Sequence, residues 1–266
     1  MKLNKKIFKT ELRGEEISLE VSELAGQASG SVIGRHGDTT VLATVVMGKK
    51  DKEGDFFPLT VDYEERFYAA GKILGSRFVR REGRPSDEAI LSARLIDRTI
   101  RPLFDQRLRR EVQVIVTILA YDEKNDPDTI ALLAASAALG ISNIPWSGPV
   151  AGVRTIKTKA EAENFYHTFF AGTEEKINMI EFGGKEVAEE EAVKVFKAAH
   201  EEIKKLIKFQ KDVITEIGKP KSDVHLKEPN PEFKKKVQEF IVKDLEQALA
   251  DKTVYELKDK LVENLV

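Results

Sequence analysis

Alternation of apolar and polar residues in the first third of the chain predicts β-strands. It runs over residues 6–12 and 15–21, on either side of an Arg13-Gly14 hairpin turn. Residues 29–33 and 40–47 form a second pair around a turn that contains glycine and aspartate. Because residues 40–46 are mostly β-branched and almost continuously apolar, we expect a central strand there.

After this strand-rich segment, the apolar residues recur with helical spacing. A serine at position 86, with two acidic residues directly after it, predicts the N-terminus of a helix that runs to Arg101. Residues 128–139 are small and apolar, which predicts a second helix packed closely on a sheet. Gly140 is expected to end that helix.

The remaining pattern completes an α+β domain over residues 1–218. Further strands are predicted at 56–61, 112–121, 148–155, 164–171 and 177–182, and a long amphipathic helix at 186–217. Three prolines mark residues 219–231 as a linker, and residues 232–266 have the apolar spacing of helices. Since one or two helices cannot bury themselves alone, we expect part of an all-helical domain there.

Composition narrows the class of protein. The 266 residues are 41% hydrophobic and 33% charged, which excludes whole-chain disorder. The absence of cysteine excludes disulfides and thiolate metal sites, and favours a reducing, cytoplasmic setting. The sequence has no apolar run of membrane-spanning length and no secretory signal at its start.

Charge is distributed unevenly, although the net charge is only −2. Ten of the fourteen arginines lie between Arg77 and Arg110, where there is no lysine and only five acids. Guanidinium groups suit bidentate contact with phosphate, so this window is a candidate polyanion surface. The alternative is a solvated surface held by internal salt bridges.

A glycine-containing segment, residues 68–85, carries the most specific chemistry. It displays Phe78 beside Arg80 and Arg81, with Arg84 following. Bases stack on aromatic rings and guanidinium planes while phosphates pair with the charges, so this loop is a candidate contact for single-stranded RNA. The alternative is that Phe78 anchors the loop to the core.

The helix after this loop has its own arginine face. Arg94, Arg98 and Arg101 are spaced i, i+4 and i+7 and therefore share one side of the helix. Asp97 is placed to pair with Arg94 or Arg101, which leaves surplus positive charge.

Several runs together resemble the first ribonuclease-PH-like core of bacterial polynucleotide phosphorylases. The matching runs are Phe56 to Arg66, Tyr68 to Ile73, Arg80 to Pro85, Ala93 to Phe104, Ala134 to Leu139 and Ile144 to Pro149. The resemblance implies a phosphate-dependent 3′-to-5′ exoribonuclease of mRNA degradation, which also works in reverse as a nucleoside-diphosphate polymerase. It also implies a homotrimeric ring around an RNA channel, a possible RNA-degradation complex, and magnesium and inorganic phosphate as cofactor and co-substrate.

The resemblance assigns roles to the arginines. Phe78, Arg80, Arg81 and Arg84 would line the channel constriction. Arg94, Arg98 and Arg101 would approach the substrate near a second core. One departure is Val79, which replaces the second of two adjacent aromatic residues in the family loop. Residues 154–170 also look shorter than in the family and permit no transfer of roles.

The resemblance places catalysis outside this chain. In the family, the second core supplies serines that hold phosphate, together with an aspartate and a lysine before an Ala-Gly-Thr run. Here that run is Ala171-Gly172-Thr173, and the two positions hold His167 and Phe169. Asp128-Thr129-Ile130 stands where the serines would be. We therefore expect no catalytic residue and no metal ligand in this chain.

Two other hypotheses remain open. The chain could act alone as a non-catalytic, RNA-binding ring subunit of the exosome type. It could also be an α+β domain whose arginine cluster only forms internal salt bridges.

Overall fold

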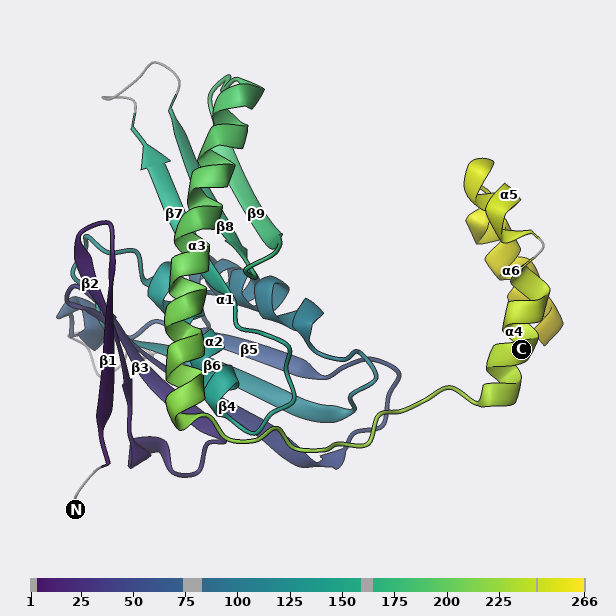
Figure 1. The fold of residues 1–266 in the computed structure, drawn as a ribbon, viewed down its shortest axis with the longest axis horizontal. Helices are drawn as coiled ribbons and strands as arrows, with labels where there is room; N and C mark the ends of the chain where they lie inside the picture. The colour runs from purple at the N-terminus through teal and green to yellow at the C-terminus, as the bar shows by residue number, and fades with distance from the viewer. Residues whose placement is uncertain (1–3, 74–82, 159–164, 243, 266) are drawn as a thin grey trace. The chain divides into compact units, whose positions relative to one another are not determined.

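The computed structural model describes residues 4–73, 83–158, 165–242 and 244–265 (Figure 1). The chain divides into two compact units, Met1–Val224 and His225–Val266. The first unit is the mixed α+β domain expected from the sequence, and the second contains the C-terminal helices.

A six-stranded sheet forms the base of the first unit. Its strands are β1 (Lys6–Leu12), β2 (Glu15–Val21), β3 (Gly30–His36), β4 (Thr39–Asp51), β5 (Leu59–Glu64) and β6 (Arg110–Ala120). Their order is β1-β2-β3-β4-β6-β5, and every neighbouring pair is antiparallel except β5 and β6. The parallel pair requires a crossover, which α1 (Asp87–Ile100) provides.

The helix α2 (Pro127–Ile141) lies between this sheet and the remaining elements (Figure 1). Every residue from Thr129 to Ile141 is buried, which explains why the helix is apolar on all sides. Its polar side chains are satisfied internally, since the hydroxyl of Ser136 accepts a hydrogen bond from the amide of Val150 at 2.9 Å. The carbonyl of Val150 in turn accepts from Gln210 at 2.7 Å.

A second, three-stranded sheet lies on the other side of α2. It consists of β7 (Ala151–Lys157), β8 (Tyr166–Gly172) and β9 (Ile177–Gly184), paired antiparallel in that order. The long helix α3 (Glu189–Ile217) packs on one face of this sheet, where Phe196 meets Phe170 edge to face at 5.5 Å. Short 3₁₀ turns occur at Glu23–Ala25, Phe67–Ala70 and Arg101–Leu103.

Gly140 was expected to end α2, but it does not. The helix continues to Ile141, and a side chain at position 140 would collide with Ile214 of α3. The glycine therefore allows two buried helices to approach closely.

The segment after α3 is attached along the C-terminal end of α2. The amide of Lys219 donates to the carbonyl of Ile141, and that of Ser222 to Asn143. The ammonium of Lys221 donates to the carbonyls of Leu139, Gly140 and Ser142 at 2.8, 3.0 and 2.9 Å. These carbonyls belong to the end of a helix, where backbone acceptors lack intrahelical partners. The first residues of the expected linker thus belong to the first unit.

The second unit contains α4 (Pro231–Ile241), α5 (Leu245–Ala250) and α6 (Val254–Leu265). Asn230 caps α4 by accepting hydrogen bonds from the amides of Glu232 and Phe233. Many apolar side chains of the second unit are exposed, including Phe233, Leu249 and Tyr255. Among the described residues of the whole chain, none of the helices has the length and hydropathy that a bilayer span requires.

Gly30 tests the close packing of α2 on the six-stranded sheet. A Cβ at this position would lie 2.5 Å from the carbonyl oxygen of Ala138, so Gly30→Ala must push β3 away from the helix. We expect a loss of about 2 kcal/mol in the free energy of unfolding, measured by urea denaturation. Gly26→Ala is the control, because its Cβ meets only a carbonyl oxygen at 3.6 Å. Equal midpoints for the two variants would contradict this packing.

Candidate functional site

A cleft of about 1340 Å³ opens in the first unit above the N-terminus of α2. One wall is α1, which contributes Leu91, Ser92 and Leu95. The other wall is one face of the second sheet, where strand pairing places Ile156 opposite His167, and Arg154 in line with Glu181 across Phe169. The floor and rim complete it with Tyr63 to Phe67, Ala69, Ala70, Lys72, Gly83 to Ser86, Glu88, Ala89, Ile118, Tyr121, Lys124 and Asp126 to Asp128.

The wall formed by α1 is fixed at its start by Ser86. Its hydroxyl accepts a hydrogen bond from the amide of Ala89 at 3.0 Å and donates to Glu65 at 2.7 Å. This is the N-cap expected from the sequence, and it orients the helix so that Leu95, Ile96 and Ile100 are buried.

The predicted loop residues reach this cleft at one point. Arg84 is exposed and lines the cleft beside Lys72. Phe78, Arg80 and Arg81 lie outside the described residues, so their channel role stays a prediction.

The structure separates the three arginines predicted on α1. Arg94 and Arg98 are exposed. Arg101 instead forms two hydrogen bonds with Asp97, at 2.9 and 2.6 Å, and donates to the carbonyls of Phe57 and Leu59. Its guanidinium therefore ties the end of α1 to the start of β5, which leaves Arg94 and Arg98 as the outward cations of this helix.

The N-terminus of α2 is closed by its own carboxylates. Asp126 is the N-cap and accepts a hydrogen bond from the amide of Asp128 at 2.8 Å. Arg154 of β7 forms ion pairs with Asp126 and, at 2.9 Å, with Asp128. The same guanidinium lies 5.4 Å from the ring centre of Phe169. A helix N-terminus commonly binds an external anion, but here internal anions occupy it.

Burial adds to this closure. It raises the pKa of Asp128, and the negative charge of Asp126 raises it further, while Ser92, Arg154 and Tyr63 oppose the shift. Burial also raises the pKa of Tyr63, with Asp128 next in effect. The phenol therefore stays protonated and donates to the carboxylate.

The two positions compared with a catalytic aspartate and lysine both lie on β8. His167 is exposed in the cleft, with its ring against Gly183. Phe169 is fully buried beneath Arg154. Asp128, His167 and Phe169 could be compared with the family pattern from the sequence, whereas Arg154 could not, because its partners are distant in sequence.

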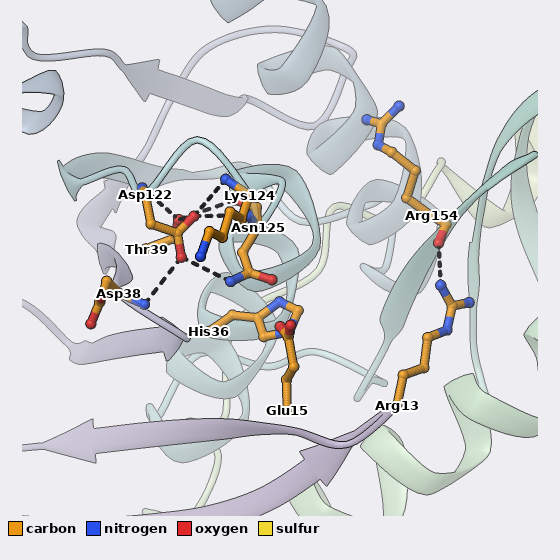
Figure 2. A network of polar contacts seen from close by, with 9 residues as sticks. All are labelled: Arg13, Glu15, His36, Asp38, Thr39, Asp122, Lys124, Asn125 and Arg154. Carbon is orange, nitrogen blue, oxygen red and sulfur yellow. Dashed lines mark hydrogen bonds and ion pairs between the residues drawn. The ribbon is translucent and has the colours of Figure 1, made fainter. Parts of the chain in front are cut away.

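A polar network behind the cleft holds this arrangement (Figure 2). Asp122 accepts hydrogen bonds from the amides of Asp38, Lys124 and Asn125 and from the side chains of Thr39 and Asn125. These bonds outweigh desolvation and hold the pKa of Asp122 far below its usual range. The turn between β3 and β4 is thereby joined to the loop that leads into Asp126.

Arg13 contacts β7, which belongs to the cleft wall formed by the second sheet. From the β1–β2 turn it donates to the carbonyl of Arg154 at 2.8 Å, as Figure 2 shows, and pairs with Glu202 of α3 at 2.6 Å. His36 and Glu15 are drawn in the same view, and Nε2 of His36 lies 3.1 Å from a carboxylate oxygen of Glu15. Arg13, which lies near the N-terminus of the chain, thus holds the backbone of Arg154 in place.

The arrangement does not suit a phosphate. An incoming phosphate would meet two carboxylates, and among the described residues the guanidinium close to them, that of Arg154, is already paired with both. Within the part of the chain that the structure describes, no three histidine or acidic side chains are grouped to hold a metal ion.

Comparison with known proteins identifies the class of this fold. A model of the 3′ exoribonuclease family, domain 1, matches residues 13–145. The crystal structure of rice (Oryza sativa) Rrp46 has the same fold, with a TM-score of 0.54 and 15% identity over 79% of this chain and 94% of that chain. The chain belongs to the 3′ exoribonuclease family.

Curated relatives are closer in sequence. Polyribonucleotide nucleotidyltransferase of Heliobacterium modesticaldum is 43% identical over 254 residues, which cover 91% of this chain and 36% of that protein. The enzyme of the same name from Bacillus cereus is 40% identical over 99% of this chain and 39% of its own length. The chain thus spans well under half the length of these relatives.

Arg154 tests the closure of the α2 N-terminus. Arg154→Met leaves two partly buried carboxylates without their cation, so we expect a loss of about 2 kcal/mol in unfolding free energy near neutral pH. Because the folded-state pKa of Asp128 is raised, its ionised form opposes folding, and protonation removes that cost. The difference from wild type should therefore shrink as the pH falls through the raised pKa.

Denaturant titrations at neutral and mildly acidic pH measure this effect. Arg110→Met is the matched control, since Arg110 pairs with Asp51 at the surface at 3.3 Å and its loss should cost less than about 1 kcal/mol. A difference between Arg154→Met and wild type that is independent of pH would contradict the role given to Asp128.

Asp122 tests the network behind the cleft. Asp122→Asn cannot accept the same set of hydrogen bonds, so we expect a loss of about 2 kcal/mol at neutral pH. A lowered folded-state pKa gives stability that is present above the ordinary value of 3.8 and is lost as the pH falls through the lowered pKa. Unfolding of the variant should therefore depend less on pH in the acid range. Asp38→Asn, at an exposed position nearby, is expected to leave both the stability and its acid dependence unchanged.

Proposed function

We propose that this chain is the RNA-guiding part of a polyribonucleotide nucleotidyltransferase, a phosphate-dependent 3′-to-5′ exoribonuclease. The observation that carries the proposal is the closed N-terminus of α2, where Asp126 and Asp128 hold Arg154. A core built in this way does not bind the attacking phosphate, so its contribution is to bind and direct the RNA.

The chemistry of phosphorolysis supports this division of roles. The reaction needs a bound phosphate, an acid for the leaving 3′ oxygen and a cation near the developing charge. In this cleft, the carboxylates of Asp126 and Asp128 occupy the start of α2, and apolar Phe169 stands at the position compared with the lysine of the family. The phosphorolytic site, with its magnesium ligands and inorganic phosphate, is therefore assigned to a second core outside these residues.

The exposed cations support the guiding role. Arg84 at the mouth of the cleft and Arg94 and Arg98 on α1 remain outward-facing, whereas Arg101 is used internally. Arg80 and Arg81 lie near Phe78 in the same arginine-rich stretch of the sequence. Guanidinium groups with an adjacent aromatic ring suit the backbone and bases of single-stranded RNA.

The proposal extends to the setting of the enzyme. We infer a cytoplasmic homotrimer, assembled through ribonuclease-PH-like cores, that degrades mRNA alone or within an RNA-degradation complex. The family membership and the names of the relatives support this assignment.

RNA binding by the loop is tested with Arg80→Ala/Arg81→Ala. A labelled single-stranded oligoadenylate should bind wild type more tightly, and the log–log salt slope of the variant should be shallower by about 1.4, since each phosphate contact on single strands contributes about 0.7. Fluorescence anisotropy across a salt series measures both values. Lys235→Ala/Lys236→Ala removes the same charge from exposed sites on α4 and serves as the control.

Release of nucleoside diphosphate is followed in the same samples. The expected result is binding that depends on these arginines, without phosphorolysis. Phosphorolysis by the purified chain would contradict the assignment of catalysis to another core. Identical salt slopes for wild type and variant would favour a loop that is held by internal salt bridges.

A further inference from the structure

A second cationic surface lies on α3, apart from the arginine window. Between positions 194 and 211 this helix carries six lysines and two glutamates, although the whole chain is slightly acidic. At 3.6 residues per turn, the lysines fall within about one third of the helix circumference. They lie opposite the buried stripe formed by Val195, Ile203, Leu206 and Val213.

The acids on this stretch are largely neutralised by other groups. Glu202 is paired with Arg13 at 2.6 Å, and Glu201 with Lys204 at 2.7 Å. Lys211 is paired with Glu174. Four lysines remain exposed with no ion pair among the described residues: Lys194, Lys197, Lys205 and Lys208. We call these four residues the lysine face.

Three further glutamates, residues 189–191, lie in the first turn of α3. They are one or more turns from most of the lysine face, and their charge interacts favourably with the N-terminus of the helix dipole. The charges of α3 are thus unevenly distributed: the first turn is acidic, residues 194–211 are basic, and two acids follow, the exposed Asp212 one turn after Lys208 and Glu216, which pairs with Lys6.

The lysine face is long enough for an extended polyanion. Its first and last lysines are 14 positions apart, which corresponds to about 21 Å of helix. In Figure 1, α3 packs against the second sheet with one side, and no other element of the first unit covers its outward side in this view. Flexible lysine side chains adapt to a phosphate backbone as point charges without demanding a fixed geometry.

We propose that the lysine face is a second binding surface for single-stranded RNA, which holds the body of a long substrate outside the cleft. The choice of RNA as the polyanion rests on the proposed function. The surface lacks what an anionic membrane would need, because the apolar stripe of α3 is buried against β7, β8 and α2 and is not available for insertion. The four residues offer charge without an aromatic anchor, which fits a phosphate backbone better than a protein partner.

The test replaces Lys194, Lys197, Lys205 and Lys208 together by glutamine, which keeps helix propensity and removes only charge. Anisotropy of a labelled oligoadenylate is measured across a salt series with the full chain. At about 0.7 per phosphate contact, four lost contacts should make the log–log slope shallower by about 3. Circular dichroism confirms that the helix content is unchanged.

The matched control removes four exposed lysines from the second unit, at Lys234, Lys236, Lys258 and Lys260, for the same change in net charge. Its slope should stay within one contact of wild type. An equal loss in the control would show a net-charge effect and overturn the proposal, as would an unchanged slope in the lysine-face variant. Binding of phosphatidylserine vesicles, but not of oligoadenylate, through these lysines would also overturn it.

The Arg80→Ala/Arg81→Ala variant separates this proposal from the proposed function. If only the arginine variant loses affinity, the lysine face has no role and the guiding loop stands. If only the lysine-face variant loses affinity, the second surface stands and the role of the loop fails. If both lose affinity, both surfaces bind RNA. A wild-type chain that does not bind oligoadenylate contradicts both.

Discussion

Burial of α2 from Thr129 to Ile141 is the constraint on which the first unit depends. A helix leaves unpaired amides at its start and unpaired carbonyls at its end, and burial without partners would be costly at both. Asp126 supplies an acceptor at the start, while Ser142 and Lys221 supply donors at the end. The two sheets and α3 can pack around this helix only because its polar ends are satisfied by side chains.

The same constraint decides what the cleft can do. The free amides at the N-terminus of a helix favour negative charge, so the start of α2 is a position where a phosphate could bind. In this chain the negative charge comes from the protein itself, and Arg154 balances it. Positive charge available to a ligand is left on the outside, on the arginines near α1 and the lysines of α3. This closed interior and cationic exterior are the two features on which the proposed RNA-guiding role rests.

Much of the fold could be predicted from the sequence because its causes are local. The β1 and β2 strands and their turn were predicted to the residue, and Ser86 caps α1 as expected. The prediction failed where contacts come from distant segments. Gly140 was interpreted as a helix end, but it makes room for Ile214. Arg101 was grouped with an exposed face, but it pairs with Asp97 and donates to the carbonyls of Phe57 and Leu59 at the start of β5.

In the candidate site, too, features with local causes could be predicted and those with distant partners could not. Asp128, His167 and Phe169 could be compared position by position with a catalytic pattern, whereas Arg154 had no local signal and acquires its meaning from Asp126 and Asp128 across the fold. The roles of Phe78, Arg80 and Arg81 stay predictions.

The attachment of Lys221 has a mechanical consequence. A force on the second unit would reach the first through the segment that follows α3, and there it would meet an ammonium bonded to three carbonyls at the end of α2. The load would therefore pass into the deepest element of the core and would spare the last turn of α3. Lys219 and Ser222 add backbone hydrogen bonds to Ile141 and Asn143, so this segment is attached to the end of α2 at several points.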